Sequence, residues 1–380
     1  MKKNLFFILF ISAIFLHANN FQDYLKRQNQ AFDTYKSTFE KEFEAYKTAY
    51  DKSLESYKKE ILTIWPTAEI STKHKFIQYN ADYSSKKSID YEKENIEIEV
   101  VAKDEQEARN KIQIALKDLV EEDVKNAYEK DQLEYKINEI LKQTPEVQSK
   151  EKLIGDVLSQ EEKKNFMEVA KQEPLVTTAY ENKTIYKLNV KLPNEALIKK
   201  AQQFKQSVDV YSSKNDINKE LVYAVIHSES SFNPMARSHI PAFGLMQIVP
   251  QSAGVDTYQF LYGEKKLLSA DYLYNPSNNI KIGSTYLHIV YFNYLRHIHN
   301  PLSRLYCSIA AYNTGAGNVA RSFVRSNNIK KASKKINTMT PEEVYKHLMR
   351  NLPYNETKHY LQKVNDRRFV YLKLIEDNTL

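Results

Sequence analysis

The hydrophobic period of this 380-residue chain changes at Pro193–Asn194. Before that point, residues 96–100 and 186–192 alternate strictly between apolar and polar side chains, the pattern of half-buried β-strands. After it, apolar residues recur at helical spacing towards the C-terminus. We therefore expect a mainly α-helical protein in which a smaller α+β domain, residues 19–193, precedes a helical domain, residues 194–380.

A long helix is predicted at the start of the α+β domain. The apolar stripe from Phe32 to Ile61 advances 29 residues in eight steps, a mean of 3.6 residues, which is the period of a straight α-helix. Its many tyrosines favour a packed face, and an oligomer interface is the alternative. A hairpin between residues 88–91 and 96–100 is expected next, followed by a charged helical region that begins at an Asp104 cap.

The first 18 residues predict an export signal. Two lysines precede an apolar run from Leu5 to Leu16, which is shorter than the roughly 18 apolar residues of a membrane-spanning helix. We expect residues 1–18 to be a signal peptide, and an uncleaved N-terminal anchor is the alternative. Because Cys307 is the single cysteine, an intramolecular disulfide is excluded, and no cysteine follows the run to carry a lipid.

The two predicted domains differ in charge. Residues 21–194 contain 29 Lys and Arg against 34 Asp and Glu, whereas residues 195–380 contain 24 against 14, a net charge of +10. A positive excess favours an anionic partner. For an exported protein, a lipid surface or a carboxylate-bearing cell-wall polymer fits this charge better than nucleic acid, and nucleic acid is not expected.

One acid, Glu229, lies within the stretch HSESSFNPMARS at residues 227–238. It follows Val222 by seven residues and so projects from the apolar face of a helix that Asn218 can cap and that Asn233-Pro234 ends. Desolvation and the negative end of the helix dipole both disfavour a carboxylate there, which predicts a raised pKa. Such an acid can protonate a glycosidic oxygen. The alternative is a structural glutamate that caps a backbone group or pairs with a cation.

Two later stretches strengthen the first interpretation. Residues 243–248, FGLMQI, predict a tight glycine turn with an amide beside it. Residues 310–318, AAYNTGAGN, predict a helix end, a glycine turn and a new helix that presents a phenol and an amide. Taken singly, each stretch is also compatible with an ordinary turn or helix corner.

In their order and spacing, these stretches resemble the lytic transglycosylases of the soluble-type lysozyme-like superfamily, bacterial enzymes that cleave peptidoglycan. The resemblance covers roughly residues 200–365. It depends on Glu229–Pro234 with Ser238, on Gly244–Gln247, on Ala311–Asn313 and on Glu356–Tyr360. Residues 76–101 and 337–341 resemble the membrane-bound lytic transglycosylase C branch. That branch is typically lipid-anchored, and this chain lacks the acylated cysteine.

The resemblance implies a lysozyme-like fold for residues 194–380 and a periplasmic enzyme of cell-wall remodelling. It implies non-hydrolytic cleavage of the β-1,4 bond between N-acetylmuramic acid and N-acetylglucosamine, which leaves 1,6-anhydro ends. Glu229 would act first as general acid and then as base, with no metal or other cofactor. The expected partners are peptidoglycan glycan strands, with peripheral association of the N-terminus with the membrane or with envelope proteins.

The resemblance also implies a set of substrate-binding residues. Ser238 and Gln247 are expected to contact the muramoyl residue, Tyr312 to orient Glu229, and the remaining members to line the groove. The set is Ser238, Met246, Gln247, Tyr312, Asn313 and Tyr360.

Two alternative functions stay open. One is a muramidase-type hydrolase, which would need a second carboxylate, with Asp256 and Asp271 as candidates. The other is a non-catalytic peptidoglycan-binding scaffold of the envelope, for which the acid would have no use.

Overall fold

A computed structural model describes residues 40–154, 157–193, 195–239 and 241–380. The chain divides into two compact units, residues 1–51 and residues 52–380. The predicted signal peptide and the first part of the tyrosine-rich stripe lie outside the described residues. The backbone is helical over residues 40–61, which confirms the predicted period from residue 40 onwards.

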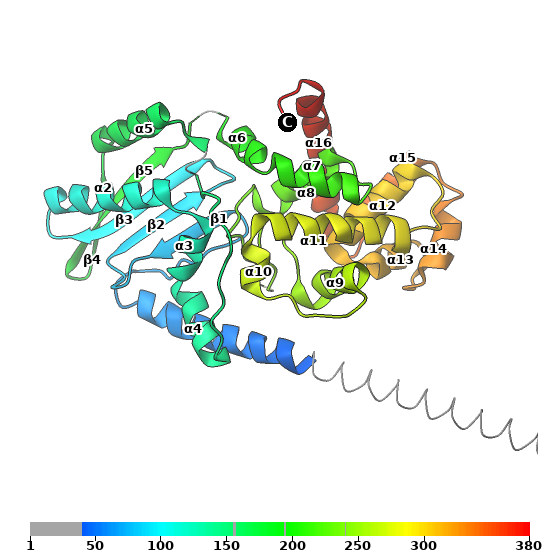
Figure 1. The fold of residues 1–380 in the computed structure, drawn as a ribbon, viewed down its shortest axis with the longest axis horizontal. Coiled ribbons are helices and arrows are strands. Elements are labelled where there is room, and N and C mark those ends of the chain that lie inside the picture. The colour runs from blue at the N-terminus through cyan, green and yellow to red at the C-terminus, as the bar shows by residue number, and fades with distance from the viewer. Residues whose placement is uncertain (1–39, 155–156, 194, 240) are drawn as a thin grey trace, which may run out of the picture. The chain divides into compact units, whose positions relative to one another are not determined.

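All the described strands belong to one antiparallel sheet of five strands, in the order β1-β2-β3-β5-β4 (Figure 1). The predicted hairpin is confirmed, since Ser88 lies opposite Glu97 and Ile89 opposite Ile96. The two segments with strict alternation fall in β3 and β5, which pair with each other. The strands are β1 Lys75–Tyr79, β2 Ser85–Asp90, β3 Asn95–Ala102, β4 Val176–Tyr180 and β5 Lys183–Lys191.

Four helices connect β3 to β4, and α2 packs on β3. Asp104 caps α2 by accepting a hydrogen bond from the Glu107 amide, as predicted. The helical region is not continuous, because Asp123 and Asp131 cap two further helices in the same way. The four are α2 Glu105–Glu121, α3 Val124–Glu129, α4 Gln132–Leu141 and α5 Gln160–Gln172.

Described residues from 195 onwards form helices and turns. The helix that carries Glu229, α8, packs against the last helix, α16, and α16 also packs against α12. The elements are α6 Ala196–Gln203, α7 Lys205–Lys214, α8 Lys219–Ser230, η2 Pro250–Gly254, α9 Val255–Tyr262, α10 Ala270–Tyr274, α11 Pro276–His288, η3 Ile289–Tyr294, α12 Pro301–Thr314, α13 Ala316–Val324, α14 Ile329–Ile336, α15 Pro341–Asn351 and α16 Asn355–Glu376.

This architecture confirms the predicted fold class, a mainly helical chain with an α+β region ahead of an all-helical region (Figure 1). The exact boundary at residues 193 and 194 stays a prediction. Across the described ranges, the helices lack the combination of length and apolar character that a membrane crossing requires.

Candidate active site

Helix α8 places Glu229 in a buried position, with 4% of its surface exposed. The helix begins after Asn218, as predicted, although the Asn218 side chain donates to Glu220 (2.9 Å) instead of capping the helix. It ends at Ser230, before the proline, because Ser231 and Phe232 adopt left-handed φ values of 51° and 64°. Glu229 therefore lies in the last turn, and the chain reverses immediately behind it.

Polar residues of the motif hold this reversal in place. The Ser230 hydroxyl is fully buried and lies 2.8 Å from the carbonyl oxygen of Leu245, which it can reach as a donor. The Asn233 side chain accepts a hydrogen bond from the Met235 amide (3.0 Å). These two side chains are structural, since each satisfies backbone groups that the turn removes from a helix. The first of them ties the end of α8 to the glycine turn.

The predicted glycine turn is present, and Gly244 is required there. Its φ is +72°, and a Cβ would lie 2.5 Å from the Leu273 carbonyl oxygen and 2.4 Å from the Asn279 side-chain nitrogen. Asn279 is fully buried and binds three backbone groups, among them the Met246 amide (2.8 Å). Asn279 was not among the residues predicted from the sequence, because an asparagine within an amphipathic stretch carries no local signal of such a role.

Two predicted tyrosines lie beside Glu229. The Tyr312 hydroxyl donates to the Met246 carbonyl oxygen (2.8 Å), and burial followed by the charge of Glu229 raises its pKa well above the ordinary value. The same causes raise the pKa of Tyr360. Its hydroxyl is buried next to the carboxylate, and although the hydrogen bond between them is poorly aligned, it lowers the pKa of Glu229. The structure thus brings Tyr312 and Tyr360 together around the acid.

Met246 and Gln247 form the turn that Tyr312 contacts. Met246 is fully buried, and its side chain packs so tightly on Gly283 that a Cβ there would lie 2.3 Å from the sulfur atom. Its backbone, not its side chain, reaches Tyr312. Gln247 donates from Nε2 to the Gly244 carbonyl (3.0 Å), and its buried Oε1 has no hydrogen-bond partner among the described residues. That oxygen is therefore a buried acceptor that no described group satisfies.

Asn313 and Ser238 each take part in one hydrogen bond that holds neighbouring segments together. The Asn313 side chain accepts a hydrogen bond from the Thr357 hydroxyl (2.7 Å), which links α12 to α16. The backbone amide of Ser238 donates to the Ala242 carbonyl (3.1 Å), which closes the loop ahead of the glycine turn. Both residues are half-buried.

The structure adds one residue that the sequence analysis missed. Lys73 precedes β1, and its ammonium nitrogen lies 3.3 Å from Oε2 of Glu229. Burial raises the pKa of Glu229 above its ordinary value, in the predicted direction, while Lys73 opposes this increase. The local sequence offers no signal for this contact, since the two residues are 156 positions apart.

The candidate second carboxylates do not lie at Glu229. Asp256 accepts a hydrogen bond from the Tyr294 hydroxyl (2.6 Å), and the charge of Asp271 acts on Glu134. The acid whose charge raises the pKa of Glu229 is Glu356, an exposed residue of α16. Groups of His, Cys, Asp and Glu suited to a metal ion are absent from the ranges that the structure describes.

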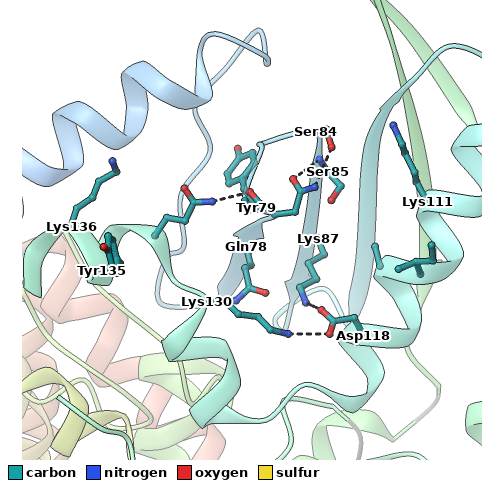
Figure 2. A pocket seen from close by; sticks show the side chains of 15 residues that line it. Gln78, Tyr79, Ser84, Ser85, Lys87, Lys111, Asp118, Lys130, Tyr135 and Lys136 are labelled. Atoms are coloured by element: carbon teal, nitrogen blue, oxygen red, sulfur yellow. Dashed lines mark hydrogen bonds and ion pairs between the residues drawn. The ribbon is translucent and has the colours of Figure 1, made fainter. Parts of the chain in front are cut away.

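A large pocket of about 760 Å³ lies elsewhere, over β1 and β2 and between α2 and α4 (Figure 2). Its lysines are already matched by acids. Lys87 pairs with Asp118 and Glu122, and Lys130 pairs with Asp118 (3.0 Å), as the dashed lines in Figure 2 show for Asp118. Lys136 pairs with Glu60 (2.7 Å) in the same manner. The pocket therefore offers no uncompensated charge to a ligand.

Comparison with known proteins identifies a matching family and several relatives of this chain. Residues 206–336 match the Transglycosylase SLT domain family. The membrane-bound lytic murein transglycosylase C of Serratia proteamaculans is 41% identical over 202 residues, 52% of this chain and 56% of the relative. The protein of the same name from Klebsiella pneumoniae strain 342 is 41% identical over 189 residues, 50% of this chain and 52% of the relative. The chain thus spans about half the length of these curated relatives.

Among solved structures, the 70 kDa soluble lytic transglycosylase of Escherichia coli is 22% identical, with a TM-score of 0.36, and the match covers 48% of this chain and 29% of that one. The matched family segment contains Glu229, the glycine turn, Tyr312 and Asn313. The match to the Transglycosylase SLT domain family over residues 206–336 agrees with the family that the order of the motifs resembles.

Proposed function

We propose that this protein is a peptidoglycan lytic transglycosylase with Glu229 as its catalytic acid and base. The observation that carries the proposal is the buried carboxyl group of Glu229, which lies beside the half-buried Tyr312 and the buried Tyr360 and whose pKa is raised by burial, in a segment that matches the Transglycosylase SLT domain family. A carboxyl group whose burial favours the protonated form is suited to protonate a glycosidic oxygen. The two curated relatives carry the same activity in their names.

In the proposed reaction, Glu229 donates its proton to the oxygen that links N-acetylmuramic acid to N-acetylglucosamine, and the C1–O bond breaks. The carboxylate that remains then removes the proton from the C6 hydroxyl of the same muramoyl residue. The C6 oxygen bonds to C1 and closes a 1,6-anhydro ring. Glu229 regains its proton, so the step consumes no water and needs no second carboxylate.

The neighbouring residues have separate proposed roles. The Tyr312 hydroxyl donates its hydrogen bond to the Met246 carbonyl. Its oxygen can therefore accept a hydrogen bond from protonated Glu229 and orient that side chain. The free Oε1 of Gln247 is a suitable acceptor for a substrate N–H or O–H group. Ser238, Asn313, Tyr360 and Met246 are proposed to line the binding site, Met246 through its backbone.

The test is mass spectrometry of the muropeptides released from purified sacculi. Anhydro ends are expected, each lighter by one water molecule than the product of hydrolysis. Reducing ends would instead identify a muramidase-type hydrolase, which needs a second carboxylate. Glu356 would then be the first candidate to examine, because its charge raises the pKa of Glu229. Binding to sacculi without any released product would identify a non-catalytic scaffold.

The chain is further proposed to act in cell-wall remodelling in the periplasm, with residues 1–18 as its signal peptide and residues 19–193 and 194–380 as its two domains. The lipoprotein branch that it resembles is anchored by a cysteine that this chain lacks. Attachment to the membrane would therefore depend on the N-terminus or on other envelope proteins. Fractionation of cells that produce the full chain tests this.

A further inference from the structure

The segment just before β1 lies directly against the motif that carries Glu229. The Asn233 side chain donates to the carbonyl oxygen of Lys73 (3.3 Å), and the Arg237 amide donates to that of Thr72 (3.4 Å). The His74 ring lies 3.1 Å from the Ser231 hydroxyl. Three consecutive residues are thus fixed to residues more than 150 positions later.

A buried ion pair fixes the two regions to each other at a second place. Arg237, which lies one residue before Ser238, binds Glu134 (2.7 Å) and Asp131 (3.0 Å) at the start of α4. Arg237 is 5% exposed and Glu134 is 1% exposed. Because buried ion pairs hold only in well-defined geometry, this pair fixes the sheet region against the Glu229 loop.

Lys73 is positioned by this arrangement to act on the acid. Its ammonium nitrogen lies 3.3 Å from Oε2 of Glu229, and the two side chains are 32% and 6% exposed. The lysine therefore approaches from the solvent side of a carboxyl group that the protein otherwise encloses. At such a separation and burial, a cation strongly favours the ionised form of its partner.

The groups that face Glu229 come from three elements. Tyr312 of α12 is half-buried and Tyr360 of α16 is buried, and both contribute phenol groups, while Glu356 of α16 contributes a negative charge. Lys73, from the segment before β1, is the cation paired with it among the described residues. Without Lys73, the hydrogen bond from Tyr360 would be left to oppose the effects of burial and Glu356 on the pKa of Glu229.

We propose that Lys73 is a positioning residue of the active site, through which the sheet region holds the Glu229 carboxylate and sets the pH range of the reaction. The inference rests on the proposed function of Glu229. In the first half of that reaction, the ammonium group stabilises the carboxylate that proton donation leaves behind. In the second half, it keeps the same carboxylate directed at the muramoyl residue until the C6 hydroxyl proton arrives.

The sign of the pH effect follows from the need for a protonated acid. Activity falls as pH rises through the pKa of Glu229, because the proton donor is lost. Lys73 lowers that pKa. Its replacement by methionine, which keeps the length of the chain without the charge, should therefore move the alkaline limb of the pH profile to higher pH, by about one unit or more. The maximal rate should fall about tenfold, because the remaining acid is weaker.

The experiment compares the wild type with Lys73→Met, Lys73→Arg and Lys75→Met. Lys75 is a matched control, since it lies two residues away and pairs with Glu69 (3.1 Å) and Glu97 (3.5 Å). Initial rates of sacculus digestion are measured from pH 4 to 9. The titration of the Glu229 carboxyl group is followed separately by carbon-13 NMR, with its signal assigned from Glu229→Gln.

The expected result is an upward shift in both readouts for Lys73→Met, wild-type behaviour for Lys73→Arg and no shift for Lys75→Met. Coincident NMR titrations of the wild type and Lys73→Met would overturn the inference, and so would an equal shift in Lys75→Met. Thermal unfolding identifies any variant that has lost its fold. Because the NMR titration needs no turnover, a wild type that releases no muropeptides would overturn the proposed function and leave the role of Lys73 separately measurable.

Discussion

The neighbourhood of Glu229 and the pocket over the sheet both contain lysines paired with carboxylates, yet they differ in their balance of charge. In the pocket, the buried Lys87 pairs with both Asp118 and Glu122. Lys130 and Lys136 are likewise each paired with an acidic side chain. At Glu229, a single and partly exposed lysine opposes burial and does not cancel it. Despite its volume of about 760 Å³, the pocket over the sheet is therefore the poorer candidate for catalysis. An acid left incompletely compensated by its surroundings marks the reactive site better than volume does.

The largest expected effect follows from Glu229→Gln. The amide keeps the shape of the side chain but cannot donate a proton to the glycosidic oxygen, so the rate of muropeptide release should fall by about 10²–10⁴-fold or more. Release is measured by chromatography of digested sacculi. Glu356→Gln is the matched control, since Glu356 is exposed and acts only at a distance. Activity retained by Glu229→Gln at neutral pH would remove the distinction between the two regions.

The pocket should respond in stability and not in the pH profile. Lys87→Met leaves Asp118 and the buried Glu122 with Lys130 as their remaining partner, which should cost about 3 kcal/mol of unfolding free energy, the low end of the range for a broken buried ion pair. Urea denaturation measures this loss. The alkaline limb of the pH profile should stay at the wild-type position, because Lys87 pairs with acids of its own region. A shifted limb would show that the two regions are electrostatically coupled.

A smaller loss of stability is expected at the glycine turn. Gly244→Ala introduces a Cβ at φ +72°, in contact with the Leu273 carbonyl and the Asn279 side chain, so backbone strain of about 1–3 kcal/mol is expected. Gly263→Ala is a matched control for the strain alone, since Gly263 has φ +78° with open space around its Cβ position. A greater loss for Gly244→Ala in thermal unfolding would isolate the contribution of the close contacts. Equal losses would contradict that contribution.

Local patterns predicted much of the fold. The strict alternation at residues 96–100 and 186–192 fell in paired strands, and Asp104 caps α2. The patterns failed where several caps follow each other closely, since Asp123 and Asp131 divide a charged stretch that reads as one helical region. A helix boundary depends on which aspartates accept hydrogen bonds from backbone amides, and the hydrophobic period does not predict which aspartates do so.

The sequence by itself determined the face on which Glu229 lies, the direction of its pKa and the order of the turns around it, because each depends on neighbours within one or two helical turns. Only the tertiary structure decided which side chains meet the acid. Lys73 lies in a polar stretch that any exposed loop could contain, yet it pairs with Glu229. Asn279 lies on an ordinary helix, yet its side chain binds the Met246 amide of the glycine turn. Both contacts join residues that are far apart in the sequence. Such contacts depend on how the sheet region and the helices pack, and the hydrophobic period of a local segment does not predict that packing.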